Sequence, residues 1–190
     1  MGIITGLTST TKKNILLDAG AIYKDWVFGT DTVATAAAKL IGATVGGAQL
    51  NVTLEYRQMA VDGAKGPTKG LVVIDSVTAV LSATVKEITA KALKLALPTI
   101  AETALTGYSK MVISEDLPDT AYATNITYVG KILGASDPII IVLKNALDMN
   151  GLQLQTQDKN EAGIPIVMTA HYDIADLSDV PVEIYLPAVS

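Results

Sequence analysis

The sequence predicts a mainly β fold: a β-sandwich or partly open barrel with one short flanking α-helix and one long β-hairpin. Residues 49–61 and 71–88 alternate apolar and polar side chains, as in a sheet with one buried and one wet face. The 190 residues are 49% hydrophobic but only 5% aromatic, which favours thin sheet packing over an aromatic-lined pocket. The clearest helix signals, a capping residue and a proline stop, bound one short segment, 90–97. Together these features predict the fold class.

The predicted hairpin spans residues 49–88 and is longer than one domain needs. Its arms have 13 and 18 residues, against about 5–6 in a usual strand. The apolar face, which includes Leu54 and Leu81, should form the core. The polar face should stay wet, and it carries Asn51, Thr53, Glu55, Arg57, Ser76, Thr78, Ser82, Thr84 and Lys86. A ribbon of this length is useful when a sheet continues into neighbouring subunits.

Before the hairpin, the chain divides into an arm and a first strand. Residues 1–13 are rich in Gly, Thr and Ser and form either a frayed terminus or an arm that orders on a neighbour. Residues 14–28 should form a strand in which Trp26, the single tryptophan, packs in the core or an interface. Ala34–Ile41 forms either a short helix ended by Gly42 or part of an extended link that ends in a Gly-Gly turn before the first long strand.

After the hairpin, Thr89 can cap a helix over 90–97 that Pro98 ends. A second short helix is expected near Thr99–Leu105. Residues 121–133 alternate again and predict a strand.

The last third should contain further strands. The apolar run Ile139–Leu143 predicts a strand covered on both faces, followed by a turn at 144–151. Strands are expected at 152–157 and 164–172, with the loop Asp158–Gly163 between them. The main β-domain is thus placed at 14–173, and residues 174–190 form a C-terminal arm or edge strand.

No constellation of catalytic or metal-binding residues is evident. The chain has no cysteine and one histidine, His171, which is too few for a zinc site. No nucleophile elbow or calcium loop is present. The glycines of residues 62–70 fail as a phosphate loop, because Pro67 lacks an N–H and Gly70 opens a strand. We therefore expect no enzyme, no cofactor and no metal, and a structural role for His171.

Charge and hydropathy narrow the partners further. The net charge of −5 argues against a grip on nucleic-acid phosphates. No signal peptide and no apolar stretch of membrane-spanning length is visible, so we expect a protein made without export.

Three segments carry a family resemblance: NILLDAGAIYKDW at 14–26, VDGAKGPTKGLVVID at 61–75, and residues 137–173. Together they resemble the tail tube protein, or major tail protein, of long-tailed bacteriophages. The resemblance implies six copies in a ring and stacked rings that form a conduit for the genome. It also implies that the polar ribbon face lines the lumen. The inter-ring contact would fall on the 62–70 loop, with Asp62, Gly63, Lys65, Gly66, Pro67, Lys69 and Gly70.

The family also implies partners and a location. The partners would be further copies of the chain, the tail terminator, the distal tail protein and the tape measure protein. DNA would pass through without specific binding, and no membrane is involved. The protein would be made and assembled in the host cytoplasm and reside in the virion tail. The same fold serves contractile tails and secretion-system tubes. The alternative is a small-molecule- or carbohydrate-binding β-domain of a baseplate or surface module, against which the low aromatic content argues.

Overall fold

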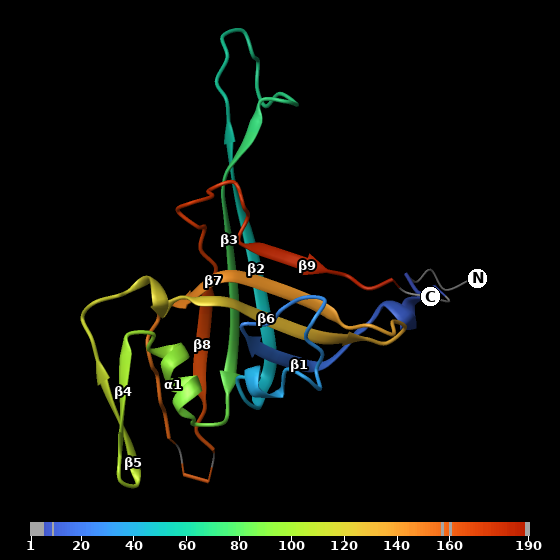
Figure 1. Ribbon diagram of the computed structural model, residues 1–190. Helices are drawn as coiled ribbons and strands as arrows, with labels where there is room; N and C mark the ends of the chain where they lie inside the picture. The colour runs from blue at the N-terminus through green and yellow to red at the C-terminus, as the bar shows by residue number, and fades with distance from the viewer. Residues whose placement is uncertain (1–5, 9, 157, 160, 189–190) are drawn as a thin grey trace.

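The protein is mainly β, with one α-helix among the described residues (Figure 1). The structure is a computed structural model that describes residues 6–8, 10–156, 158–159 and 161–188. Its strands are β1 (Leu16–Lys24), β2 (Thr44–Gln58), β3 (Val72–Val85), β4 (Ile100–Leu105), β5 (Tyr108–Ile113), β6 (Ala123–Ile132), β7 (Ile139–Asp148), β8 (Ile164–Thr169) and β9 (Val182–Tyr185). The helix is α1 (Ala90–Ala96), and 3₁₀ turns lie at Thr11–Asn14, Ala37–Lys39 and Asp119–Ala121.

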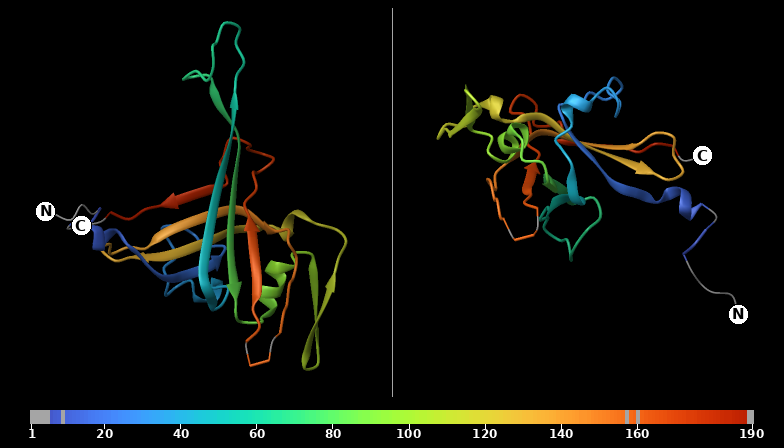
Figure 2. Two further views of the ribbon diagram at one scale, coloured as in Figure 1. Left: turned by 180° about the vertical axis from the view of Figure 1, so that it is seen from behind. Right: turned by 90° about the horizontal axis from the view of Figure 1, so that it is seen from below.

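Seven strands form one curled sheet. Its order is β1-β6-β7-β8-β3-β2, and β9 pairs with β7 off this path. The two ends of the path approach each other, since Tyr23 of β1 bridges Leu40 and the Ile41 N–H donates to the Ile22 carbonyl. The predicted partly open barrel with a flanking helix is therefore confirmed (Figure 2).

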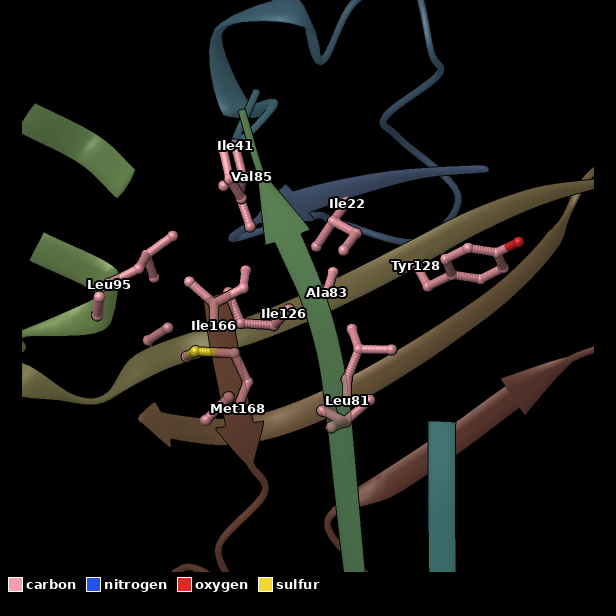
Figure 3. Close-up of a cluster of buried hydrophobic side chains, with 14 of the residues drawn as sticks. Ile22, Ile41, Leu81, Ala83, Val85, Leu95, Ile126, Tyr128, Ile166 and Met168 are labelled. Carbon is pink, nitrogen blue, oxygen red and sulfur yellow. The ribbon is translucent and has the colours of Figure 1, made fainter. Parts of the chain in front are cut away.

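The main core lies between the curled sheet and α1 (Figure 3). Leu81, Ile126, Ile166 and Met168 are almost completely buried there, together with Leu95 of the helix. Each such side chain contributes about 1.5–3 kcal/mol by burial. This core sets which face of β3 points inward.

A smaller core covers the other face of β6 and β7. It contains Tyr23, Trp26, Val129, Ile140 and Val142. The first half of β7 is thus covered on both faces, as the apolar run at 139–143 predicts. Trp26 is 4% exposed and has the packing role expected of it.

Helix α1 follows its sequence signals. The Thr89 hydroxyl accepts a hydrogen bond from the Ala92 N–H at 3.2 Å, which satisfies one of the free donors of the first turn. The helix ends at Ala96, two residues before Pro98. It buries Ala92, Leu95 and Ala96 against the sheet, which is what stabilises so short a helix.

The long hairpin is confirmed as the β2–β3 ribbon. The two strands pair from Thr44↔Val85 to Gln58↔Val72, but only residues 80–85 of β3 also pair with β8. The distal half of the ribbon therefore projects from the body as a two-stranded arm. The β4–β5 hairpin projects from the opposite end of the molecule (Figure 1).

Several local predictions are wrong. The helix expected at Thr99–Leu105 is strand β4, which pairs with β5 across the turn at Gly107. The turn expected from residue 144 begins only after Asp148, because β7 continues. The strand expected at 152–157 is irregular over 152–156, and residue 157 lies outside the described residues.

The candidate helix Ala34–Ile41 is also not formed. Only a 3₁₀ turn at Ala37–Lys39 appears there. In the part of the chain that the structure describes, no helix has the length and hydropathy needed to span a bilayer.

Candidate functional site

The candidate site is the β2–β3 ribbon, whose two faces differ. Ala79, Leu81 and Val85 of β3 are buried in the core, whereas Thr78 is exposed and Ser82 is half-buried. Side chains alternate across a strand, so the polar set lies on the face directed away from the core. That this face lines a channel stays a prediction.

The nine predicted lumen residues vary in exposure. Five are exposed: Asn51, Thr53, Glu55, Arg57 and Thr78. Four are half-buried: Ser76, Ser82, Thr84 and Lys86. The register brings the members together in pairs, with Thr53 opposite Thr78 and Glu55 opposite Ser76. The Ser76 hydroxyl donates to the Glu55 carboxylate at 2.9 Å.

A bulge interrupts the ribbon at Asp75. The register shifts between Glu55 and Tyr56, so Asp75 has no partner in the ladder. The Arg57 Nε donates to both oxygens of the Asp75 carboxylate, at 2.9 and 3.1 Å. This exposed ion pair adds little stability, but it offsets the charge of Arg57 on the polar face. Sequence reasoning missed it, because the two residues are far apart along the chain.

Beyond the bulge, the core-side face of the ribbon continues into solvent. Tyr56 stands opposite Ile74, and Val72 opposite Gln58. Tyr56 is 65% exposed and Ile74 54% exposed. Alternation puts these side chains on the same face as Leu54 and Val77, so an apolar stripe runs past the end of the core. The sequence also indicates this stripe, because the alternation of apolar residues in the two arms runs on for longer than one core can cover.

The 62–70 loop forms the open tip of the ribbon. Gly63, Gly66 and Gly70 have φ values of 88°, 152° and 92°, in the region that favours glycine. The loop is tied by hydrogen bonds such as Leu71 N–H to the Thr68 carbonyl. All nine residues are exposed. Within the described residues, Lys65 and Lys69 make no ion pair.

The strand edges beside the polar face are open. β2 pairs with β3 alone among the described strands, which leaves one side of its 15 residues without strand partners. β8 pairs with β7 only through Met168 and Thr169. The first part of β8 therefore has no strand partner on the side that faces away from β3. Open edges of this kind invite pairing with another chain.

Two acidic surfaces are candidate receivers for Lys65 and Lys69 of a neighbouring copy: the C-terminal region and the Asp158–Gly163 loop. In the C-terminal region, Lys144 binds Asp179 at 2.9 Å and Glu183 at 2.6 Å, so these carboxylates are already paired. The Asp158–Gly163 loop, of which residue 160 lies outside the described residues, lies at the end opposite the ribbon tip (Figure 1). Its Glu161 side chain is 86% exposed and only loosely placed against Lys86, at 3.7 Å.

An apolar cavity of about 750 Å³ bears on the alternative of ligand binding. It is lined by Trp26, Phe28, Val33, Ile140 and Tyr185, among others. The rings of Phe28 and Tyr185 stack on each other at 3.8 Å, and Trp26 is buried. One face of each of these two rings is therefore covered by the other ring, although Phe28 remains 52% exposed.

His171 is held by its surroundings. Its Nδ1 lies 3.1 Å from the Asn145 carbonyl oxygen, and its ring meets Tyr122 edge-on at 5.3 Å. Over the described residues, no group of three or more His, Asp or Glu side chains is placed to hold a metal ion.

Comparisons with known proteins find similarity only among solved structures. No protein-family model matches the chain, and no curated protein matches it. One similar structure is the tail of an empty gene transfer agent (GTA) particle with C6 symmetry, at 12% identity and a TM-score of 0.37. Another is the virion of a native gene transfer agent particle, at 12% identity and a TM-score of 0.35. Each match covers 82% of this chain and 92% of the other. At this level of similarity, function has to be argued from the surfaces of the chain itself.

Proposed function

We propose that this chain is a structural subunit of a bacteriophage tail tube. Copies join edge to edge into hexameric rings, and the rings stack into the conduit for genome passage. The observation that carries the proposal is the β2–β3 ribbon, which extends past its own core with an open edge and an uncovered apolar stripe.

Ring closure would satisfy the open strand edges. The free side of β2 in one copy can pair with the free part of β8 in the next, so a closed ring covers part of the open edge in every copy. Each contact is small, but every copy makes two of them, so the ring gains from multivalency. The resemblance of three sequence segments to tail tube proteins supports the same arrangement and supplies the number six.

The polar face of the ribbon would then line the lumen. Its side chains are mostly hydroxyls and amides, and Arg57 is already paired with Asp75. Such a wall stays hydrated but lacks the array of free cations that binds phosphates. DNA can slide past it without being held.

The 62–70 loop would contact the next ring along the axis. The loop and the Asp158–Gly163 segment lie at opposite ends of the molecule, so one copy can present its loop to the facing end of the next. Lys65 and Lys69 would meet Asp158 and Glu161 there. The tail terminator, the distal tail protein and the tape measure protein are proposed as further partners, with the virion tail as the location.

Negative-stain microscopy and sedimentation of the purified protein test the proposal. We expect rings or tubes at high protein concentration. A protein that stays monomeric at every salt concentration, even with tail-assembly partners added, would contradict it. A ligand-binding module, the alternative function, would also remain a compact monomer.

A further inference from the structure

Two mainly apolar surfaces that no described part of the chain covers lie at opposite ends of the molecule. The first is the distal stripe of the ribbon, formed by Leu54, Tyr56, Val72 and Ile74. The second is the outer face of the β4–β5 hairpin, where Leu105, Tyr108 and Val112 surround Lys110. All seven apolar side chains are at least 37% exposed, and Tyr108 is 80% exposed.

The β4–β5 hairpin has a defined inner and outer face. Its register pairs Ala101 with Val112 and Leu105 with Tyr108, so these four side chains share one face. The exposed pair Thr103 and Lys110 lies between them on that face, where the long apolar stem of the lysine can lie along the surface while its charge stays in water. Glu102 and Met111 pair on the other face. The Glu102 carboxylate binds Lys94 of α1 at 2.7 Å, and Met111 is half-buried. The face with Glu102 is therefore turned toward the body, and the face with Tyr108 is turned away from it.

The hairpin lacks the support that a two-stranded sheet normally needs. Such a sheet is marginally stable in water by itself. Among the described strands, β4 and β5 pair only with each other, and nearly all of their residues are exposed. The distal ribbon has the same character, since beyond the bulge it too consists of two strands and a loop.

We propose that the outer face of the β4–β5 hairpin in one copy receives the apolar ribbon stripe of the next copy along the tube axis. This inference rests on the proposed function and names the surfaces that join successive rings. The occupant is a second copy, because each copy carries both surfaces and the two hairpins lie at opposite ends of the molecule (Figures 1 and 2). A head-to-tail contact covers both surfaces in every internal copy and propagates without closing.

The contact is of a known physical kind. Two apolar sheet faces pack about 10 Å apart with their side chains interdigitated. One such contact is smaller than the roughly 1,200 Å² of a stable single interface. It becomes effective when a whole ring docks at once, because all copies bind together.

Cysteine cross-linking tests the pairing directly, because the chain has no cysteine of its own. Chains with Ile74→Cys are mixed with size-tagged chains with Val112→Cys, allowed to form tubes, and treated with a short bis-maleimide. We expect abundant mixed dimers. The matched control is Thr53→Cys with Ala104→Cys, two exposed positions on the opposite faces of the same two hairpins, which should yield few mixed dimers.

The outcomes separate the inference from the function on which it rests. Tubes in which the Ile74/Val112 mixture gives no more mixed dimers than the control overturn the inference and leave the tail tube function standing. Absence of tubes from the wild-type protein overturns both.

A charge exchange provides a second readout. Ile74→Lys and Val112→Glu should each reduce the pelleted tube fraction at least fivefold, and the double variant should recover much of it by forming an ion pair. Both sites are exposed, so the melting temperatures should match that of the wild type. Full tube growth by both single variants would overturn the inference.

Discussion

Lys144 is the most heavily paired cation in the described part of the chain. It joins β7 to the C-terminal segment through Asp179 and Glu183, and these hydrogen bonds raise the pKa of Lys144 to about 12. Lys144 and Tyr185 in turn lower the pKa of the Glu183 carboxyl. The C-terminal strand β9 is thus attached by charge as well as by its ladder to β7.

Replacing Lys144 by Ala should loosen β9 without unfolding the body. A partly exposed pair contributes about 1 kcal/mol or less, so we expect a small fall in melting temperature but faster amide hydrogen exchange over Val182–Tyr185. Lys131→Ala, an exposed lysine on β6, is the control and should change neither. Unchanged exchange in the Lys144 variant would show that the ladder alone holds β9.

The same pair predicts an acid dependence. The folded pKa of Glu183 lies below its unfolded value, so its contribution is present above the unfolded pKa of about 4.3 and is lost as the pH falls through the folded pKa. The protection of the β9 amides in the wild type, measured against the intrinsic exchange rate at each pH, should therefore fall below about pH 4. In Glu183→Gln this fall should be absent.

Asp148 is a buried carboxylate at the point where β7 meets β8. It accepts hydrogen bonds from the N–H groups of Asn150 and Val167, both at 2.8 Å, and burial raises its pKa. Asp148→Ala leaves these donors unpaired and should cost about 1–3 kcal/mol in the free energy of unfolding, measured with urea. Asp148→Asn keeps one acceptor oxygen, so its free energy of unfolding should fall between those of the wild type and Asp148→Ala.

The ionisation of Asp148 acts in the direction opposite to that of Glu183. Because its folded pKa is raised, the stability it contributes decreases as the pH rises from the unfolded pKa through the folded pKa. Asp148→Asn removes this dependence. The urea stability of the wild type relative to this variant should decline over that window, and a rise would contradict the assignment.

Among the elements, the ribbon and α1 were predictable because local pattern and tertiary packing agree. The alternation from Val77 to Val85 matches the burial of β3, and Thr89 and Pro98 bound α1. Residues 99–105 contain Ala, Glu and Leu, which favour a helix in isolation. They form β4 because the turn at Gly107, with a φ of 77°, folds them back on β5. That pairing is not encoded in the segment itself.

The candidate site was predictable only in part. Which face of the ribbon is polar follows from its sequence. The bulge at Asp75, its pairing with Arg57 and the end of the core near Val77 depend on where β8 stops pairing, which one strand's pattern cannot show. The continuation of β7 to Asp148 was missed for a related reason, because Lys144 and Asn145 look like turn residues.

Deleting Ala64–Thr68 tests the loop as an element. The tip is exposed along its length, and among the described residues an added Cβ at Gly63 or Gly66 would meet nothing within 4 Å. We expect an unchanged melting temperature and loss of tube growth, because the loop acts on a contact rather than on the core. Tubes of normal length from this variant, seen by electron microscopy, would contradict the role of the loop.

At the scale of the whole molecule, the two ends carry different charges and shapes. If Lys65 and Lys69 bind the facing Asp158–Gly163 segment, changing both to Gln should lower the pelleted tube fraction and weaken its dependence on salt, since exposed pairs are screened within about 8 Å at physiological ionic strength. Lys24 and Lys131 changed to Gln are the control. Equal salt dependence in the two double variants would place the axial contact elsewhere.

The unsupported outer half of the ribbon also has a kinetic consequence. A lone chain gains little by ordering these strands, because ordering costs about 1–2 kcal/mol per residue and nothing covers the apolar stripe. An existing ring end offers that cover at once, so addition to a seed is easy while the first ring is slow to form. Polymerisation should therefore begin after a lag that short tube fragments abolish. Length would then be controlled by the number of starting points rather than by the concentration of subunits.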